Sequence, residues 1–552
     1  MNQKFDGIAG GFRRAAYRSC GYDTRQIRSK PHIGIANTYN EAAPGHALFK
    51  PIIESIKAGI WAAGGIPVEF GVPSTCGNHA IGTPALANEM AMRDIVAASV
   101  EIVSQIHLFD GIVLTAGCDN IIPGMMLAAA RLDLPTVLFV AGSMMSGCYG
   151  GSKATLSDVN EYVCGEGQTS AGSAEKLDAL EQMACPTMGA CPEMGTANTM
   201  QLLAEAMGLT LTGNATIPAY LSERRINAFA SGQACVELVK KGITALDIIT
   251  PAAIENALKV DLAIGGSTNA VLHLLALSRE IGGSLTLDDF DTWSRKIPVY
   301  VAVTPSGTHT ADEIHSAGGV PGIMYQLRRH LDLSCRTVSG QTIGQLMEKT
   351  VFTPSDIIRG HTDPVSPTGG IAVVKGNLSP EGAIVRTSAM SENCWCMQGP
   401  AVVFDSDDEA AAAVTAGRVK KGEMIVVRYA GPAGAPGMVE IHQCNDALNS
   451  LGLAEDVAII TDGRFSGFNH GAFVGHVVPE ACRGGMIAYI EDGDLITLDV
   501  EKREISVAIA PEEFERRKQQ PIKRECPVRS GFMKLYADTV LPANLGAAMQ
   551  TW

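Results

Sequence analysis

The sequence predicts a two-domain protein: an α/β N-terminal domain with a doubly wound, mainly parallel sheet, followed by a β-rich, barrel-like C-terminal domain. From residue 31 to about 210, brief β-branched runs alternate with longer segments of helical period, which is typical of βαβ units. Beyond about residue 370 the chain changes to short strand-like runs. A Gly- and Pro-bearing passage at 335–370 separates the two patterns. We therefore expect domains at 1–365 and 366–552.

The predicted N-terminal strands are short, apolar and followed by small residues, as expected of strands buried on both faces. They are HIGIAN (32–37), IPVEFG (66–71), GIVLTAG (111–117) and PTVLFVAG (135–142). The segments between them predict amphipathic or buried helices at 47–65, 86–108 and 123–133. Residues 174–290 are predicted to be mostly helical, most clearly at 222–242.

The C-terminal half predicts a series of short strands. They are expected at 370–376, 383–389, 401–405, 423–431, 457–463 and 486–509. The last of these contains Asp492-Gly493 between alternating runs, which is a hairpin signal.

Composition excludes several classes of protein. The chain has 552 residues, too many for one core, and 46% of them are hydrophobic, as in a packed globular protein. Its 43 Lys and Arg against 58 Asp and Glu give a net charge of −15, which argues against a nucleic-acid partner. No apolar run has the length of a membrane span or a signal peptide. We expect a cytoplasmic protein with reduced thiols.

Three of the 14 cysteines lie in loops where a ligand would bind. In a parallel sheet the ligand site lies beyond the carboxyl ends of the strands, and two such loops carry Cys76 and Cys118. Cys191 precedes a predicted helix in the loop at 188–200. Thiols on separate Gly-rich loops suit an iron–sulfur cluster, although each could instead be a small buried apolar residue.

The other cysteines are predicted to be structural or stay undecided. Cys394 and Cys396 form a Cys-x-Cys pair that could bind a metal or form a redox couple, but two ligands do not make a site, and an incidental loop is the simpler interpretation. The structural set is Cys20, Cys148, Cys164, Cys185, Cys235, Cys335, Cys444, Cys482 and Cys526.

Two carboxylates and one serine stand beside glycine-rich loops. Asp119 follows Cys118 directly, and Glu440 follows the glycine-rich turn that starts at residue 430. Ser466 lies in the loop TDGRFSGFNHG at 461–471, where a serine usually makes a local turn hydrogen bond.

The same residues lie in motifs that resemble the dihydroxyacid dehydratase/6-phosphogluconate dehydratase family. The resemblance extends along nearly the whole chain. Matching blocks are NTYNE (37–41), GCDNIIPGM (117–125), GACPEMGTANTM (189–200), GGSTNAVLHL (265–274), GNLSPEGA (376–383), FDSDDEA (404–410), PGMVEI (436–441), TDGRFSG (461–467) and GHVVPEA (475–481).

This resemblance implies a hydro-lyase that converts a 2,3-dihydroxy acid into a 2-oxo acid with an iron–sulfur cluster. It also implies an aconitase-like swivelling C-terminal barrel, an active site between the domains, and a homodimer or dimer of dimers. Cys118 and Cys191 match cluster ligands of the family, Asp119 and Glu440 match carboxylates that bind Mg²⁺, and Ser466 matches the catalytic base.

The sequence departs from the family pattern at three positions. Branched-chain members have a cluster cysteine where this chain has Gly45, an Asp where it has Gly77, and a lysine where it has Asn120. The 6-phosphogluconate branch, associated with a 4Fe-4S cluster, also lacks the first cysteine and has one where this chain has Cys76. We therefore expect Cys76, Cys118 and Cys191 to hold a cluster, 4Fe-4S rather than 2Fe-2S.

A magnesium site is less well supported, because Gly77 and Asn120 replace two family ligands and hard cations need several anionic oxygens. Two other functions stay open: a cluster-bearing redox or oxygen sensor, and a divalent-metal lyase without a cluster. The substrate is a small hydroxy acid that the sequence does not name. His46, His79 and Lys153 are candidate contacts to it, although each could be an ordinary polar loop residue.

Overall fold

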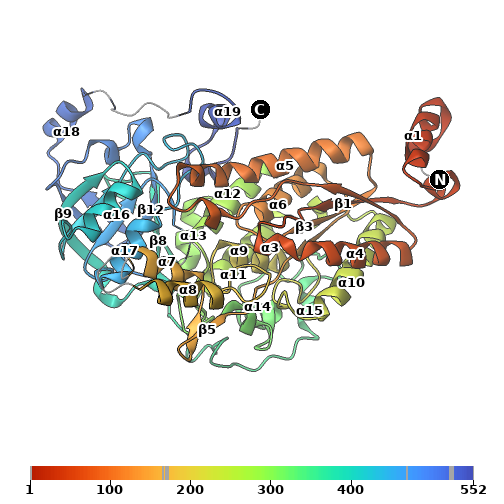
Figure 1. Cartoon of the computed structure of the whole chain (residues 1–552), viewed down its shortest axis with the longest axis horizontal. Coiled ribbons are helices and arrows are strands. Elements are labelled where there is room, and N and C mark those ends of the chain that lie inside the picture. The colour runs from red at the N-terminus through yellow and green to blue at the C-terminus, as the bar shows by residue number, and fades with distance from the viewer. Residues whose placement is uncertain are drawn as a thin grey trace.

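The computed structural model describes residues 3–164, 167, 173–465, 467, 470–520, 522 and 528–550. Ser466 and Cys526 lie outside these residues. The N-terminal elements and the C-terminal strands form two neighbouring bodies, with the C-terminal strands at the left of Figure 1. The α/β class with a parallel N-terminal sheet and a barrel-like C-terminal sheet is confirmed, whereas the domain boundary at residue 365 stays a prediction.

A parallel four-stranded sheet forms the centre of the N-terminal domain. Its order is β2-β1-β3-β4, and its strands are β1 (His32–Asn37), β2 (Ile66–Gly71), β3 (Gly111–Ala116) and β4 (Thr136–Val140). All four predicted strands are present. Every residue of β3 and β4 is buried, which explains their unbroken apolar runs.

Helices cover both faces of this sheet, as a doubly wound fold requires (Figure 1). On one face, α4 (Phe49–Ala62) packs against α10 (Glu223–Lys241), and on the other α5 (Asn88–His107) packs against α6 (Ile121–Leu132). The α4 and α10 backbones approach closely, since a Cβ on Gly59 would lie only 1.9 Å from the carbonyl oxygen of Phe229. Glycine therefore allows this helix contact.

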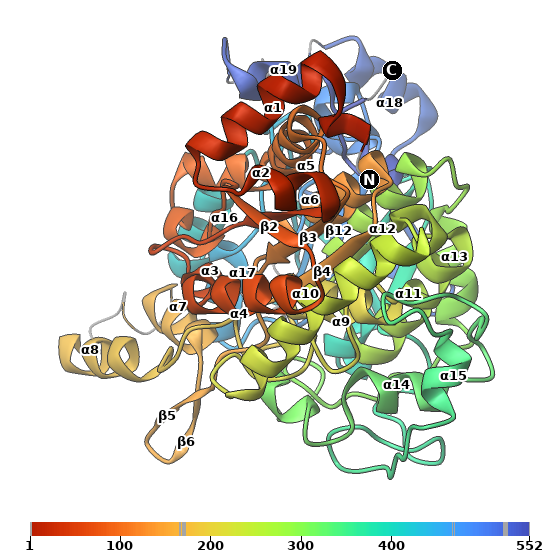
Figure 2. The same cartoon turned by 90° about the vertical axis from the view of Figure 1, so that its right-hand side faces the viewer.

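Further helices extend the N-terminal domain, and a small hairpin and α8 project from it (Figure 2). The hairpin pairs β5 (Gly147–Tyr149) with β6 (Ser152–Ala154). The other helices are α1 (Gly7–Ser19), α2 (Thr24–Ser29), α3 (Pro44–Ala47), α7 (Leu156–Cys164), α8 (Ala174–Met183), α9 (Thr196–Ala206), α11 (Pro251–Ile264), α12 (Asn269–Glu280), α13 (Leu287–Ser294), α14 (Gly319–Leu327) and α15 (Ile343–Met347).

The C-terminal domain is an eight-stranded mixed sheet of order β14-β13-β9-β10-β11-β12-β8-β7. Its edges almost meet, because Lys375 and Glu504 form a bridge beside β7 and β14. The strands are β7 (Ile371–Val374), β8 (Gly382–Arg386), β9 (Cys396–Phe404), β10 (Met424–Val427), β11 (Ala458–Thr461), β12 (Phe473–Val478), β13 (Leu495–Asp499) and β14 (Glu504–Val507), and the helices are α16 (Asp407–Thr415), α17 (Gln443–Ser450), α18 (Pro511–Lys518) and α19 (Phe532–Thr539).

The hairpin predicted at 486–509 exists, but its turn does not lie at Asp492-Gly493 as predicted. β13 and β14 pair antiparallel, with Asp499 opposite Glu504, so the turn lies at residues 500–503, where Arg503 has a φ of 64°. Asp492-Gly493 instead precedes β13. There the Asp492 side chain accepts from the backbone N–H of Val403 (2.8 Å), because the chain enters the sheet beside β9.

None of the helices described is both long and apolar enough to cross a membrane.

Candidate active site

The predicted site residues that the structure describes line one cavity of about 300 Å³. Its walls include Cys76, Cys118, Asp119 and Cys191 from the N-terminal domain and Glu440 from the C-terminal domain. Ser466, the predicted base, lies outside the described residues, and its neighbour Gly467 is described. Residues that are far apart in the sequence thus converge on one space between the two domains.

The N-terminal residues reach the cavity from the carboxyl ends of strands and from a helix start. Cys76 follows β2, and Cys118 and Asp119 lie between β3 and α6. Cys191 precedes α9, where the Asn198 side-chain amide donates to the carbonyl of Cys191 (2.6 Å). This bond fixes the loop, and the arrangement follows the general rule for parallel sheets.

Glu440 is held by backbone pairing with the loop that contains Arg464. The N–H of Ile441 donates to the carbonyl of Arg464 (2.8 Å), and the N–H of Arg464 donates to that of Val439 (3.0 Å). The two side chains therefore emerge side by side, and the Arg464 guanidinium donates to Glu440 Oε1 (2.7 Å).

The thiols of Cys76 and Cys118 interact directly. Their hydrogen bond lowers the pKa of Cys76 to about 7, while the same bond and burial raise the pKa of Cys118. Burial also raises the pKa of Cys191. Of these three thiols Cys76 is therefore the most readily ionised near neutral pH, and thiolates are the form that binds metals.

Backbone lies close to the Cys118 sulfur. A Cβ on Gly45 would lie 3.0 Å from Cys118 Sγ and 2.9 Å from the carbonyl oxygen of Gly117. The first loop therefore packs against the Cys118 loop without a side chain between them.

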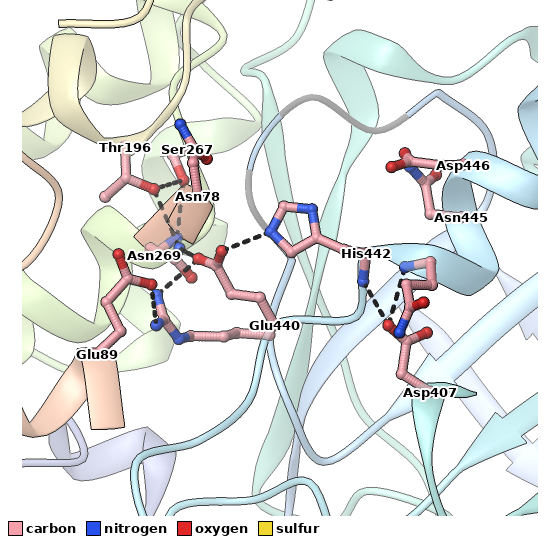
Figure 3. Close-up of polar contacts among 12 residues, drawn as sticks. Asn78, Glu89, Thr196, Ser267, Asn269, Asp407, Glu440, His442, Asn445 and Asp446 are labelled. Atoms are coloured by element: carbon pink, nitrogen blue, oxygen red, sulfur yellow. Dashed lines mark hydrogen bonds and ion pairs between the residues drawn. The ribbon is translucent and has the colours of Figure 1, made fainter. Parts of the chain in front are cut away.

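Glu440 is bonded at both oxygens. Oε1 accepts from Arg464 and from the Asn269 amide (2.8 Å), and Oε2 contacts His442 Nε2 at 2.9 Å; Figure 3 shows Glu440 between Asn269 and His442. Although burial opposes ionisation, Arg464 and His442 lower the pKa of Glu440 to about 2. Glu440 in turn raises the pKa of His442 to about 9 against the effect of burial.

Glu89 is a third carboxyl group of this cavity, and no sequence motif indicated it. Its Oε2 lies 3.4 Å from Arg464 Nη2, and a Cβ on Gly77 would lie 2.2 Å from its Oε1. Burial and the charge of Glu440 raise the pKa of Glu89 to about 8 and that of Asp119 to about 7. In the sequence Glu89 is simply an acid in the first turn of α5, a common position for acids.

The cavity wall also contains residues that the sequence did not indicate as site residues. Cys185, predicted to be structural, lines the cavity, as do Asn78, Glu193 and His442. Of the candidate substrate contacts, His79 lines it, whereas His46 is fully buried beside Thr38 and Lys153 pairs with Glu313. Cys394 is buried and Cys396 is exposed, and neither lines the cavity.

Comparison with known proteins decides the family. A model described as dihydroxy-acid/6-phosphogluconate dehydratase N-terminal matches residues 30–346, and its C-terminal counterpart matches residues 356–547. The chain belongs to this dehydratase family. It is 43% identical over 552 residues to a dihydroxy-acid dehydratase of Caldanaerobacter subterraneus, with 99% of both chains covered.

Further relatives in the family agree over the full length. A dihydroxy-acid dehydratase of Pyrococcus furiosus is 41% identical over 555 residues, covering 99% of both chains. One of Ignicoccus hospitalis is 40% identical over 544 residues, covering 97% of both. The dehydratase described here is therefore a hydro-lyase, and its family implies an iron–sulfur cluster and Mg²⁺.

The dehydratase's thiols fit an iron–sulfur cluster. Three cysteines from three loops face one cavity, and soft thiolates select such clusters. Among the described residues no three His, Cys, Asp or Glu side chains are grouped so as to hold a metal ion. That result concerns one ion, whereas the ligands of a cluster lie further apart because they bind different irons.

The residues do not fit a magnesium ion. Gly77 has no side chain, and both side-chain polar atoms of Asn120 are buried without a hydrogen-bond partner in the described part of the chain. The oxygens of Glu440 are taken by three side-chain donors, of which Arg464 also reaches Glu89. Hard cations need several free anionic oxygens, and Gly77, Asn120 and Glu440 do not provide them.

Proposed function

We propose that this protein converts a 2,3-dihydroxy acid into a 2-oxo acid in the cavity between its domains. The observation that supports this most is the convergence of Cys76, Cys118 and Cys191 with Asp119 and Glu440 on one cavity, in a member of a dehydratase family. The three cysteines would hold the iron–sulfur cluster. Three thiolates suit a 4Fe-4S cluster with one iron free of protein ligands, and 2Fe-2S is the alternative.

The reaction removes the proton from C2 and hydroxide from C3, which leave as water, and the resulting enol becomes the 2-oxo acid. When bound, the cluster supplies Lewis-acid stabilisation for the departing oxygen. We propose Ser466 as the base that takes the C2 proton, because it stands in the matched TDGRFSG motif. Cys76, Cys118 and Cys191 fix the place of the reaction, and Arg464 and His442 keep Glu440 ionised beside it.

Two further properties are proposed on the family resemblance. We expect a homodimer or a dimer of dimers and a cytoplasmic location. The partner would be the hydroxy-acid substrate alone, without nucleic acid or membrane.

Anaerobic purification tests the function. The protein should contain iron and acid-labile sulfide and should form a 2-oxo acid from at least one member of a panel of aldonic and branched-chain dihydroxy acids. A protein with a full cluster that yields no 2-oxo acid from any of them would contradict the proposal. A protein that is active with neither iron nor sulfide would contradict the cluster.

A further inference from the structure

We propose that two copies of this protein associate through the outer face of α1 and the neighbouring apolar stripe of α5. The starting point is an exposed apolar helix face that lies outside the catalytic cavity. The proposal is independent of the proposed function, because the described walls of the cavity come from one chain.

The helix α1 lies at the edge of the N-terminal domain and projects away from it (Figure 1). Its inner face is fixed against the segment that precedes it, since a Cβ on Gly10 would lie 2.2 Å from the backbone of Phe5. The Tyr17 ring packs edge-on against the rings of Phe5 and His32, with centroids 5.8 and 5.1 Å apart. The opposite face of α1 therefore points to solvent in a single copy.

This outward face of α1 is apolar. Ile8 and Phe12, one helical turn apart, are 88% and 77% exposed, and the exposed Ala15 continues the same stripe. A surface helix normally turns its apolar stripe to the core and its polar residues to water, so α1 has the reverse arrangement. Contiguous exposed apolar residues of this kind mark a face that another surface covers.

The composition of α1 points in the same direction. The helix has 13 residues, among them Gly7, Gly10 and Gly11. An isolated helix of this length is marginal in water, and glycine weakens it further. Burial of its outward face against a second surface would supply stabilisation that the helix lacks by itself.

A second exposed stripe lies beside α1, at the end of α5. Ile102 and Ile106, also one turn apart, are each more than half exposed. The Lys4 side chain, just before α1, donates to the carbonyl oxygen of Leu108 and pairs with Asp110 (2.9 Å), just after α5. A stable interface buries about 800 Å² on each partner, more than one short helix face provides, so we assign both stripes to the interface.

The distribution of charge indicates that the covering surface is a second copy. Residues 1–30 carry seven Lys and Arg side chains and two Asp side chains, a net charge of +5. Since the whole chain carries −15, residues 31–552 carry −20. The basic segment is therefore attracted to the acidic body of another copy, whereas that body would be repelled by an anionic membrane or by a nucleic acid.

The arginines of α1 are available for such an attraction. Arg13 and Arg14 donate to the backbone carbonyl oxygens of Lys4 and Phe5. Neither of them forms an ion pair with a carboxylate in the part of the chain that the structure describes, and nor does Arg18.

Two-fold symmetry gives the arrangement of the stripes. In a closed dimer every contact between the two copies forms twice, with the roles exchanged. The α1 stripe of each copy thus lies on the α5 stripe of the other, which buries Ile8 and Phe12 against Ile102 and Ile106 on both sides of the symmetry axis.

The test measures the mass of the full-length, cluster-loaded protein by light scattering during size-exclusion chromatography. The wild type should be a dimer or a dimer of dimers. Ile8→Glu combined with Phe12→Glu should halve that mass, and so should Ile102→Glu combined with Ile106→Glu, because each pair places charges in the apolar contact. All four side chains are exposed in one copy, so both variants should fold and keep the cluster absorbance.

Val351→Glu is the matched control. Val351 is 93% exposed and follows α15, which lies on the opposite side of the molecule from α1 (Figure 2). This variant adds the same charge at an equally exposed apolar residue and should keep the mass of the wild type.

Arg18→Glu tests the charge argument. It should raise the dissociation constant of the dimer about 5-fold at low ionic strength, and 0.5 M NaCl should remove most of that difference, because exposed charges are screened by salt. An unchanged dissociation constant at low ionic strength would contradict the electrostatic part of the proposal.

The remaining outcomes also decide. A monomeric wild type, or an unchanged mass in both double variants, would overturn the proposal, and a halved mass in the α1 variant alone would show that α5 is not the docking surface. A monomeric wild type that sediments with phosphatidylglycerol vesicles would assign the face to a membrane. Formation of 2-oxo acid is measured separately, so its absence in a protein of the expected mass would count against the proposed function only.

Discussion

The carboxylate of Glu89 occupies the space that a side chain on residue 77 would fill. A Cβ built on Gly77 would lie between 2.2 and 2.6 Å from the Glu89 carboxyl atoms. Glu89 belongs to α5, and Gly77 belongs to the loop after β2. A residue of one element thus fills the space that a side chain on the other would take. The Glu89 carboxyl group lies 3.4 Å from Arg464, and burial raises its pKa to about 8, which disfavours the ionised form that a divalent cation needs.

This relationship predicts weak binding of divalent cations. Mn²⁺ titrated into the cluster-loaded protein and followed by electron paramagnetic resonance should show no tight site. Combining Gly77→Asp with Glu89→Ser should strengthen Mn²⁺ binding about 10-fold or more, because the new carboxylate would no longer meet Glu89. Gly77→Asp alone should not, since it would clash with Glu89. Stoichiometric Mn²⁺ in the wild type would show that the site does accept a cation.

Cys118→Ser should remove the visible absorbance of the cluster, because a serine oxygen is a poor ligand for an iron–sulfur cluster. Cys76→Ser and Cys191→Ser should behave alike. Cys396→Ser is the control, since Cys396 is exposed and does not line the cavity. Full iron and sulfide in the Cys118 variant would exclude that residue as a ligand.

Ser466→Ala should lower turnover by about 100-fold or more while leaving the cluster absorbance unchanged, because it would remove the proposed base and no proposed cluster ligand. The assay measures 2-oxo-acid formation beside an absorbance spectrum of the same sample. Retained activity would remove Ser466 from the mechanism.

Arg386→Ala should destabilise the protein and lower kcat. The buried Arg386 guanidinium donates to the carbonyl oxygen of Gly467, beside Ser466, and to those of Met194 (3.1 Å) and Gly265 in the N-terminal domain. Losing this junction should cost on the order of 3 kcal/mol. Denaturant unfolding measures the cost, and a change within 0.5 kcal/mol, the range of ordinary surface substitutions, would count against a joining role.

Stability should fall as the pH falls below 6.5, partly because of His46. Burial lowers the pKa of His46 from 6.5 to about 3, so between these values the unfolded chain takes up a proton that the folded protein does not. The contribution of His46 is about 1.4 kcal/mol per pH unit in that window. Unfolding free energies of the wild type and His46→Gln, measured from pH 7 to pH 5, should converge as the pH falls; parallel curves would contradict a neutral buried His46.

Most elements could be predicted from the sequence because their signals are local. The runs at 32–37 and 66–71 match β1 and β2, since burial on both faces imposes an apolar, β-branched run that is visible without knowledge of the partners. The hairpin turn was misplaced for the opposite reason: Asp492-Gly493 has turn chemistry, but pairing with β9 decides where β13 begins.

The sequence by itself determined where most strands lie along the chain, which loops carry Cys76, Cys118 and Cys191, and which family motifs are present. Each of these depends on neighbouring residues alone. Only the tertiary structure decided that Glu89 lies over Gly77 and that Glu440 is enclosed by donors. The contact of Glu89 with Gly77 joins α5 to the loop after β2 within one domain, whereas the bond from Asn269 to Glu440 joins the two domains. No local pattern of residues encodes either contact.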